Sequence, residues 1–350
     1  MISPHLPAQT TPAGRRVHEF LLRALAIGLL AEAFALSCYA HPGDGGAPES
    51  VTPSFFLAQA GPPPRRATNS PDESGSTSAK NEVSITIEGD SRVIRSNGIP
   101  DHSPGQFPNR YNPNTIAPQH YNYRVPVHPA VAAEATRLRM QPFGIALNGV
   151  VFDPSAAEWW RGDRHWQYEP MRLEGKLGLD QNNAHVQPDG AYHYHAIPVA
   201  LLQRLSGGKP GVVLIGWAAD GFPIYGPWGH ADPKNPASPL KQLKTSYRVK
   251  SGNRPSGPGG AYDGLYLQDY EYVAGSGDLD ECNGRTGPTP EFPEGTYHYV
   301  LTENWPFIPR AYHGTPDHSF ERREPPGGFG PPGFGPPGGG PRRFPPGPPP

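Results

Sequence analysis

Residues 179–195 read LDQNNAHVQPDGAYHYH, and residues 279–300 read LDECNGRTGPTPEFPEGTYHYV. The two stretches are variants of one pattern, because the same residue types recur in the same order. The second copy differs mainly by five residues inserted before its aromatic run. The matched pairs are Leu179/Leu279, Asp180/Asp280, Asn183/Asn283, His185/Arg285, Gly190/Gly295, Tyr192/Tyr297, His193/His298 and Tyr194/Tyr299.

An earlier pair of segments repeats as well. GIALNGVVFD at 144–153 and GVVLIGWAAD at 211–220 share four positions. These are Gly144/Gly211, Leu147/Leu214, Gly149/Gly216 and Asp153/Asp220. Both pairs keep the same order along the chain, so we expect a single domain built from a duplicated half. Equivalent side chains of such a domain gather around its pseudo-two-fold axis, where a shared site can form.

The two ends of the chain differ in composition from its middle. The 350 residues include Pro 48 and Gly 43, much of it within residues 41–80 and 323–350. Such segments bury too little apolar surface to offset the entropy of ordering. We therefore expect a disordered linker at 41–80, a disordered tail at 323–350, and one globular domain at 81–322.

The N-terminus is typical of an export signal. Arg15, Arg16 and Arg23 precede a mostly apolar stretch that ends in Ser37-Cys38-Tyr39-Ala40. We expect residues 1–40 to be removed after Ala40, leaving a protein exported to the periplasm, the cell envelope or the medium, without a transmembrane anchor. A lipid attached to Cys38 and an amphipathic surface helix are the alternatives.

Short strands dominate the domain. Residues 81–87 alternate polar and apolar side chains, and 91–95 pair back after a Gly89-Asp90 turn. Pro126 limits the run at 119–127 to a sheet edge. Further candidate strands are 145–152, 212–218, 222–225, 247–250, 266–273 and 297–302. The Ala-rich segment 129–138 is the best candidate for a short helix. These elements indicate an all-β or β-dominated fold with long loops, a sandwich or a partly closed barrel.

The run Tyr192-His193-Tyr194-His195 carries the clearest chemistry. Side chains alternate along a strand, so both tyrosines point to one face and both histidines to the other. Two imidazoles on one face can bind one zinc or copper ion at about 2.0–2.1 Å. If the repeats meet at the axis, His298 adds a third ligand, and His185 and Asp180 complete or orient the set.

Each of these residues also has a structural interpretation. A buried Tyr-His run with satisfied polar groups is ordinary core. Asp180 and Asp280 fit turns in which Asp and Asn accept bonds from backbone NH groups, and Asp153 and Asp220 are most simply turn residues too. Once Cys38 leaves with the signal, Cys282 has no partner, which favours a buried free thiol over an intermolecular link or a ligand.

Composition and motifs argue against nucleic-acid binding, nucleotide binding and the common hydrolase classes. The net charge is −2 and no basic run exceeds a pair, which disfavours nucleic-acid binding. Hydrolase triads and nucleotide binding have no support, because GxSxG, Walker-type, HExxH and EF-hand patterns are missing from the sequence.

The chain resembles the YHYH-domain family of exported bacterial proteins, named for the run at 192–195. The match includes SNGIPDH at 96–102, LNGV at 147–150, DGFPIYGP at 220–227, LDECNGR at 279–285 and GTYHY at 295–299. The resemblance implies export and a β-rich domain. Relatives often carry Cys-Asn-Gly-His before the first run, where this chain has Asn182-Asn183-Ala184-His185, so a cysteine-dependent site is not expected here.

Three functions follow as hypotheses. The first is an exported binding domain with a histidine-lined site between the repeats, for zinc or copper. The second is a metal-dependent enzyme of the cell envelope, which needs an open metal position and a pocket. The third is a structural or adhesion module without metal, whose tail is a spacer or anchor. A cell-surface or small-molecule ligand is the expected partner.

Overall fold

The structure is a computed structural model that describes residues 79–173 and 176–322. The predicted signal, the tail and nearly all of the predicted linker lie outside the described residues. Within the described ranges the chain forms 17 β-strands, one α-helix and four 3-10 turns. The strands make several sheets, none closed into a barrel, in a sandwich-like arrangement. The prediction of a β-dominated fold is confirmed, with a sandwich rather than a barrel.

The elements run in chain order through the described part. The strands are β1 (Val83–Glu88), β2 (Ser91–Ser96), β3 (Tyr121–Pro126), β4 (Val131–Arg137), β5 (Gly144–Ala146), β6 (Val151–Phe152), β7 (Ala184–Val186), β8 (Tyr192–Tyr194), β9 (Leu214–Ala218), β10 (Pro223–Tyr225), β11 (Trp228–His230), β12 (Leu240–Gln242), β13 (Tyr247–Val249), β14 (Tyr270–Tyr272), β15 (Gly284–Thr289), β16 (Phe292–Val300) and β17 (Ala311–Gly314). The α-helix is α1 (Val199–Ser206).

A small sheet of order β1-β2-β3 precedes the repeats. β1 and β2 form the predicted hairpin, with Gly89 at a φ of 63° in its turn. β3 lies at an edge of this sheet and ends at Pro126, as the proline predicts. The guanidinium carbon of Arg92 lies 3.4 Å from the ring centroid of Trp217 in β9, so the small sheet packs against the larger one.

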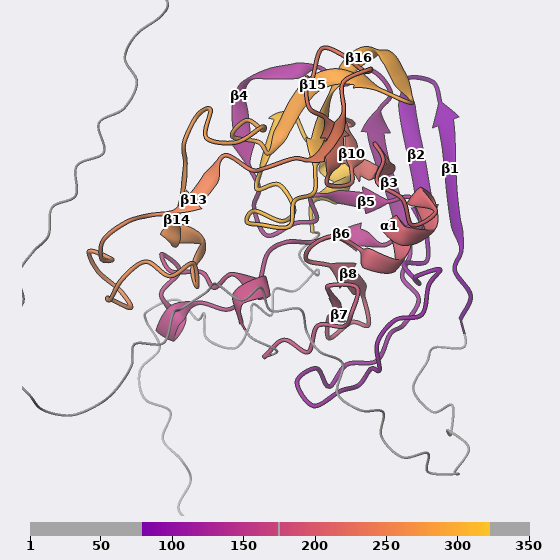
Figure 1. Cartoon of the computed structure of the whole chain (residues 1–350). Helices are drawn as coiled ribbons and strands as arrows, with labels where there is room; N and C mark the ends of the chain where they lie inside the picture. Colours follow the sequence, from indigo (N-terminus) through magenta and orange to yellow (C-terminus); the bar gives the residue numbers. More distant parts are fainter. Residues whose placement is uncertain (1–78, 174–175, 323–350) are drawn as a thin grey trace, which may run out of the picture. The chain divides into compact units, whose positions relative to one another are not determined.

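The larger sheet shows the duplication directly. Its eight strands have the order β15-β16-β10-β9-β5-β6-β8-β7. The order is a palindrome in which β5, β6, β8 and β7 correspond to β9, β10, β16 and β15. β5 and β9 meet antiparallel at the centre, so the pseudo-two-fold axis passes between them. In Figure 1, β7 and β8 lie at the opposite end of this arrangement from β15 and β16.

The pairing of the central strands corrects one detail of the sequence comparison. Gly144 pairs with Ala218, and Ala146 pairs with Gly216. The axis therefore relates Gly144 to Gly216 and not to Gly211. The other three pairs shift by the same five residues, so Asp153 corresponds to Tyr225 and not to Asp220. The tight turns agree, because Gly149 donates to Ala146 O at 2.8 Å and Gly221 donates to Ala218 O at 2.9 Å. Apolar runs rich in glycine align equally well in several registers, and only the ladder selects one.

The helix prediction at 129–138 is wrong. Residues 131–137 form β4, a mostly exposed strand that pairs antiparallel with β17. Alanine has the highest helix propensity, but propensity is a weak determinant, and backbone pairing with a distant strand overrides it. The α-helix of the described ranges is instead α1, which ends at Gly207 with a φ of 61°. No helix in the described ranges is long and apolar enough to cross a membrane.

Candidate metal site

The first repeat positions its histidines through a tight hairpin. Asn183 adopts a φ of 56°, and its NH donates to Asp180 O at 3.0 Å just before β7 begins. Gly190, with a φ of 87°, closes the turn between β7 and β8. A Cβ at Gly190 would lie 2.5 Å from the Cβ of Ala117, so a larger residue does not fit there. The resulting register places His185 directly opposite His193.

Three imidazoles converge in this hairpin. The Nε2 atom of His195 lies 3.0 Å from Nε2 of His193 and 3.0 Å from Nε2 of His185. His185, His193 and His195 form a group that could hold a metal ion, with ligand atoms all within 4.8 Å of one another. We call it the histidine triad. Tetrahedral ligands at about 2.0–2.1 Å from an ion lie a little more than 3 Å apart, close to the two contacts of 3.0 Å that His195 Nε2 makes.

The other ring nitrogens determine the proton positions. His185 Nδ1 lies 2.8 Å from Leu177 O, and His193 Nδ1 lies 3.1 Å from Ala191 O. A carbonyl only accepts, so each Nδ1 carries the proton and each Nε2 presents a lone pair. One proton on His195 Nε2 can satisfy one of its two contacts and not both. A cation at the centre of the histidine triad would relieve the remaining repulsion between lone pairs.

Burial keeps the histidine triad neutral. His193 and His195 are each 1% exposed, and His185 is partly buried. Desolvation lowers the pKa of His193 and His195 well below that of a free imidazole, and the neighbouring imidazoles lower it further. Burial also lowers the pKa of His185. Neutral imidazole is the form that binds a metal, so these side chains are ready to coordinate at neutral pH.

The tyrosines point to the opposite face of the sheet, as predicted. The hydroxyl of Tyr192 donates to Asp180 Oδ2 at 2.6 Å, while Asn148 Nδ2 donates to the hydroxyl of Tyr194 at 2.9 Å. His102 Nε2 also lies 2.7 Å from that hydroxyl. Both rings are fully buried and belong to the main core cluster.

Asp180 supports the hairpin and is not part of the histidine triad. Its Oδ1 accepts from the NH groups of Asn182 at 2.8 Å and Ala184 at 3.2 Å. Its Oδ2 accepts from Gly105 N at 2.8 Å in addition to Tyr192. Oδ1 thus holds the turn, which is the capping role that the Leu-Asp-x-x-Asn pattern also suggested, while Oδ2 links the turn to Gly105 and Tyr192.

The structure does not bring His298 to the histidine triad. β16 and β8 are five strand positions apart in the sheet, about 24 Å at about 4.8 Å per strand. The group therefore lies within the first repeat and not between the repeats. His298 instead packs edge-on against Tyr225, with ring centroids 5.2 Å apart. In the second repeat Arg285 and Val300 stand where His185 and His195 stand in the first.

Asp153 is a polar residue at the site that the sequence analysis treated as a turn residue. Its NH donates to Tyr194 O at 2.9 Å, which continues the parallel pairing of β6 with β8. Its side chain therefore points to the same face as those of His193 and His195. The carboxylate is buried and forms an ion pair with Arg322. The alternation of side chains along β6 could have placed Asp153 on the face of the histidines. That inference also needs the parallel register between β6 and β8, which the sequence does not reveal.

Cys282 is a buried free thiol, the interpretation that the sequence favoured. Burial raises the pKa of its thiol to about 12, so it is protonated at neutral pH. Its backbone NH donates to Asp280 Oδ1 at 2.9 Å, just as Asn182 donates to Asp180 in the first repeat.

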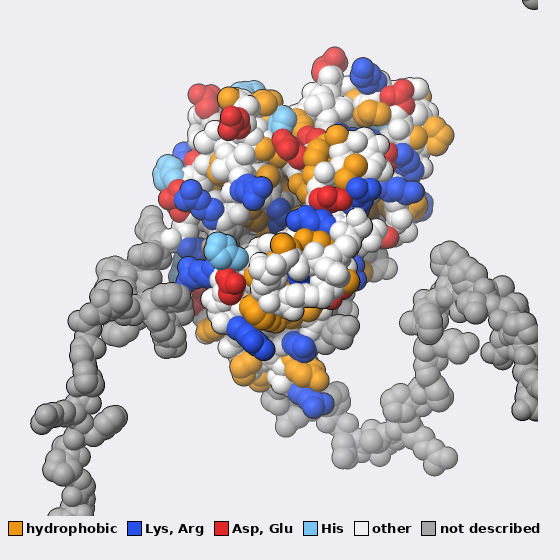
Figure 2. Space-filling view, turned by 90° about the vertical axis from the view of Figure 1, so that its left-hand side faces the viewer, with side chains coloured by type: hydrophobic (Ala, Val, Ile, Leu, Met, Phe, Trp, Pro, Cys, Tyr) orange, Lys and Arg blue, Asp and Glu red, His pale blue; other side chains and the backbone are white. Residues whose placement is uncertain are grey.

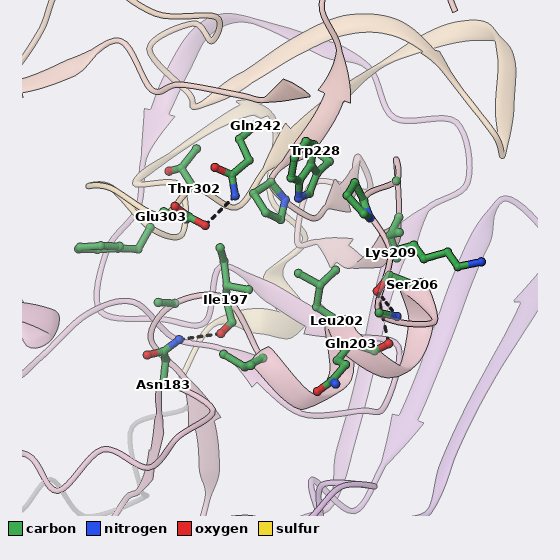
Figure 3. A pocket seen from close by; sticks show the side chains of 18 of the residues that line it. Asn183, Ile197, Leu202, Gln203, Ser206, Lys209, Trp228, Gln242, Thr302 and Glu303 are labelled. Atoms are coloured by element: carbon green, nitrogen blue, oxygen red, sulfur yellow. Dashed lines mark hydrogen bonds between the residues drawn. The ribbon is translucent and has the colours of Figure 1, made fainter. Parts of the chain in front are cut away.

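Two cavities adjoin the first repeat. One, of about 310 Å³, is lined by His193, Asp153 and Gln187 together with Tyr121, Tyr123 and Arg322. The other, of about 640 Å³, lies beside α1 and is shown in Figure 3. There Leu202, Ile197 and Trp228 surround the space, and Asn183 Nδ2 donates to Ile197 O at 2.8 Å. The three histidines do not line this second cavity.

The surface charge is mixed. On the face drawn in Figure 2, acidic and basic side chains are interspersed, in keeping with the net charge of −2. That face presents no extended basic field of the kind a nucleic-acid surface requires.

A family model described as YHYH protein matches residues 122–314. The match covers more than half of the chain and includes the histidine triad, so the chain belongs to this family. Neither the curated proteins nor the solved structures gave a match.

Proposed function

We propose that this YHYH protein binds one transition-metal ion, zinc or copper, through His185, His193 and His195. The main support for the proposal is that three Nε2 atoms converge. That of His195 lies 3.0 Å from each of the other two. Buried polar groups in native proteins are normally paired. Facing lone pairs in a buried site are therefore costly unless an ion lies between them.

The type of ligand atom limits which metal ions can bind. Imidazole nitrogen suits zinc, copper and nickel, whereas calcium and magnesium take oxygen ligands. A thiolate contribution from Cys282 is not part of the proposal, because Cys282 belongs to the second repeat and not to the histidine triad. The Nδ1 contacts of His185 and His193 with backbone carbonyls fix both rings, as outer partners do in known metal sites.

Export is the second part of the proposal. The arginines at 15, 16 and 23, the apolar stretch after them and the segment ending in Ala40 support a cleaved signal. The mature protein then acts in the periplasm, the cell envelope or the medium. Edman sequencing of the protein recovered from outside the cytoplasm tests this, and an N-terminus at Met1 would contradict it.

Elemental analysis of the purified chain without a histidine tag tests the metal. We expect one equivalent of zinc or copper in the parent protein and less than a tenth in a His193→Ala/His195→Ala variant. The matched control is His298→Ala, because His298 has the same Nδ1 contact to a carbonyl two residues earlier but lies in the other repeat. It should keep the full equivalent.

Circular dichroism first shows that all three proteins are folded, so that their metal contents can be compared. Metal lost only in the double variant supports the proposal. Metal that is absent from the folded parent, even after incubation with zinc or copper, contradicts it and makes the histidine run a core motif. Equal metal content in all three proteins would place the ion elsewhere.

A further inference from the structure

Asp153 and the histidine triad share one face of the sheet. Val151 pairs with His193 and Phe152 with Tyr194, so Asp153 is the next residue of that ladder, beside His195. Neighbouring strands are about 4.8 Å apart, and residues at the same level of a ladder point the same way. A carboxylate thus stands next to the imidazoles without belonging to the group whose ligand atoms lie within 4.8 Å of one another.

The two oxygens of Asp153 have different surroundings. Oδ2 forms the ion pair with Arg322 and accepts from Gln187 Nε2 at 3.2 Å. Oδ1 is buried and has no hydrogen bond of good geometry from the residues that the structure describes. Burial raises the pKa of this carboxyl group, while Arg322 and the nearby NH of Ser155 lower it. An unpaired buried carboxylate oxygen is rare, because its lost hydration is not replaced. This oxygen can therefore accept a hydrogen bond from a bound molecule.

A cavity provides the space for that molecule. Of the three histidines, His193 alone lines the cavity of about 310 Å³, and Asp153 and Arg322 form other parts of its wall. The volume suits a water molecule or a small ligand. Three histidines leave the fourth position of a tetrahedral ion open, as in metal sites that bind and exchange small molecules.

We propose that the fourth coordination position faces this cavity, and that Asp153 Oδ1 accepts a hydrogen bond from the molecule bound there. The preferred occupant is neutral and carries an O–H group on its coordinating atom, such as water or a small alcohol. An anion without a proton meets the carboxylate with its lone pairs and binds weakly. This inference rests on the proposed metal site.

Cobalt(II) in place of the native metal makes the fourth position visible, because its visible absorption reports the coordinating atoms. The full chain is loaded with cobalt(II) and titrated with azide as the anion and imidazole as the neutral ligand. We expect Asp153→Asn to bind azide at least fivefold more tightly than the parent. The variant removes the negative charge that faces the bound anion and leaves the positive charge of Arg322 uncompensated. Imidazole affinity should change less than twofold.

The matched control is Asp189→Asn. Asp189 lines the same cavity, but it is exposed and its Oδ1 accepts from Ala191 N at 3.1 Å. Removing this charge should change azide affinity less than twofold. A comparable increase in both variants would show a general charge effect and overturn the assignment of Asp153.

The remaining outcomes are also decisive. If cobalt binds and azide affinity is unchanged in Asp153→Asn, or azide never alters the spectrum, this inference fails while the metal site stands. If the folded parent binds no cobalt, zinc or copper, the metal site itself fails. Should Asp153→Asn not fold, Arg322→Gln takes its place, and azide affinity must then fall at least threefold. An unchanged affinity in that variant overturns the inference.

Discussion

His193 and His298 occupy equivalent positions in the two repeats, and each places its Nδ1 3.1 Å from the carbonyl oxygen two residues before it. Of these two, only His193 belongs to a group of three histidines among the residues that the structure describes. At the position equivalent to Asp153, the second repeat has Tyr225, whose ring packs against His298. The duplicated fold thus repeats the scaffold of the hairpin, while one copy alone carries the ligands.

Metal removal should lower thermal stability. A ligand at a hundred times its Kd stabilises the folded state by about 2.7 kcal/mol. For a domain of this size that corresponds to about 5–10 °C in Tm. Calorimetry of the zinc-loaded chain before and after EDTA measures the shift. The His193→Ala/His195→Ala variant should show no difference, and an equal shift in that variant would place the stabilising ion elsewhere.

Tyr192→Phe should reduce stability without affecting metal content. The Tyr192 hydroxyl donates to the Asp180 carboxylate at 2.6 Å on the face opposite the histidine triad. Loss of a hydrogen bond to a charged group costs about 1.5–3 kcal/mol. Tyr297→Phe in the second repeat should cost less, because the contact with Asp280 is longer at 3.1 Å. Urea unfolding and elemental analysis measure both effects, and loss of metal in folded Tyr192→Phe would contradict the separation of the two faces.

His298 should make the metal-free protein sensitive to acid. Burial lowers its pKa from 6.5 to about 4, so the unfolded chain takes up this proton first as the pH falls. The folded state therefore loses stability from pH 6.5 down to about 4, by up to about 3 kcal/mol for this residue. Above pH 6.5 the contribution is constant.

The His298→Gln variant measures that contribution. With EDTA present, its free energy of unfolding should fall less steeply between pH 6.5 and 4 than that of the parent. Parallel pH profiles would show that His298 is not the buried neutral imidazole described here.

Sequence reasoning predicted the parts of the fold that depend on local pattern. The β1–β2 hairpin, the edge position of β3 and the opposite faces of the tyrosines and histidines all follow from alternation, turn residues and proline. The duplication was visible because polar turn residues such as Asp180 and Asn183 recur at fixed spacing. The strand at 131–137 was not, since pairing with β17 overrides the preference of its alanines.

The site was predicted in part for the same reason. His193 and His195 converge because of strand parity, and His185 joins them because the hairpin register sets it opposite His193. The position of the pseudo-two-fold axis determines why His298 does not join them. It passes between β5 and β9, so the two hairpins lie at opposite ends of the sheet and His298 stays apart. Asp153 comes to the site through a parallel pairing between strands about forty residues apart, which local sequence does not encode.

X-ray absorption at the metal edge of the zinc- or copper-loaded chain reads out directly which atoms bind the ion. We expect three imidazole nitrogens at about 2.0–2.1 Å together with one further oxygen or nitrogen ligand. A sulfur neighbour at about 2.3 Å would move the ion to Cys282, and fewer than two imidazoles would contradict the histidine triad as the metal site.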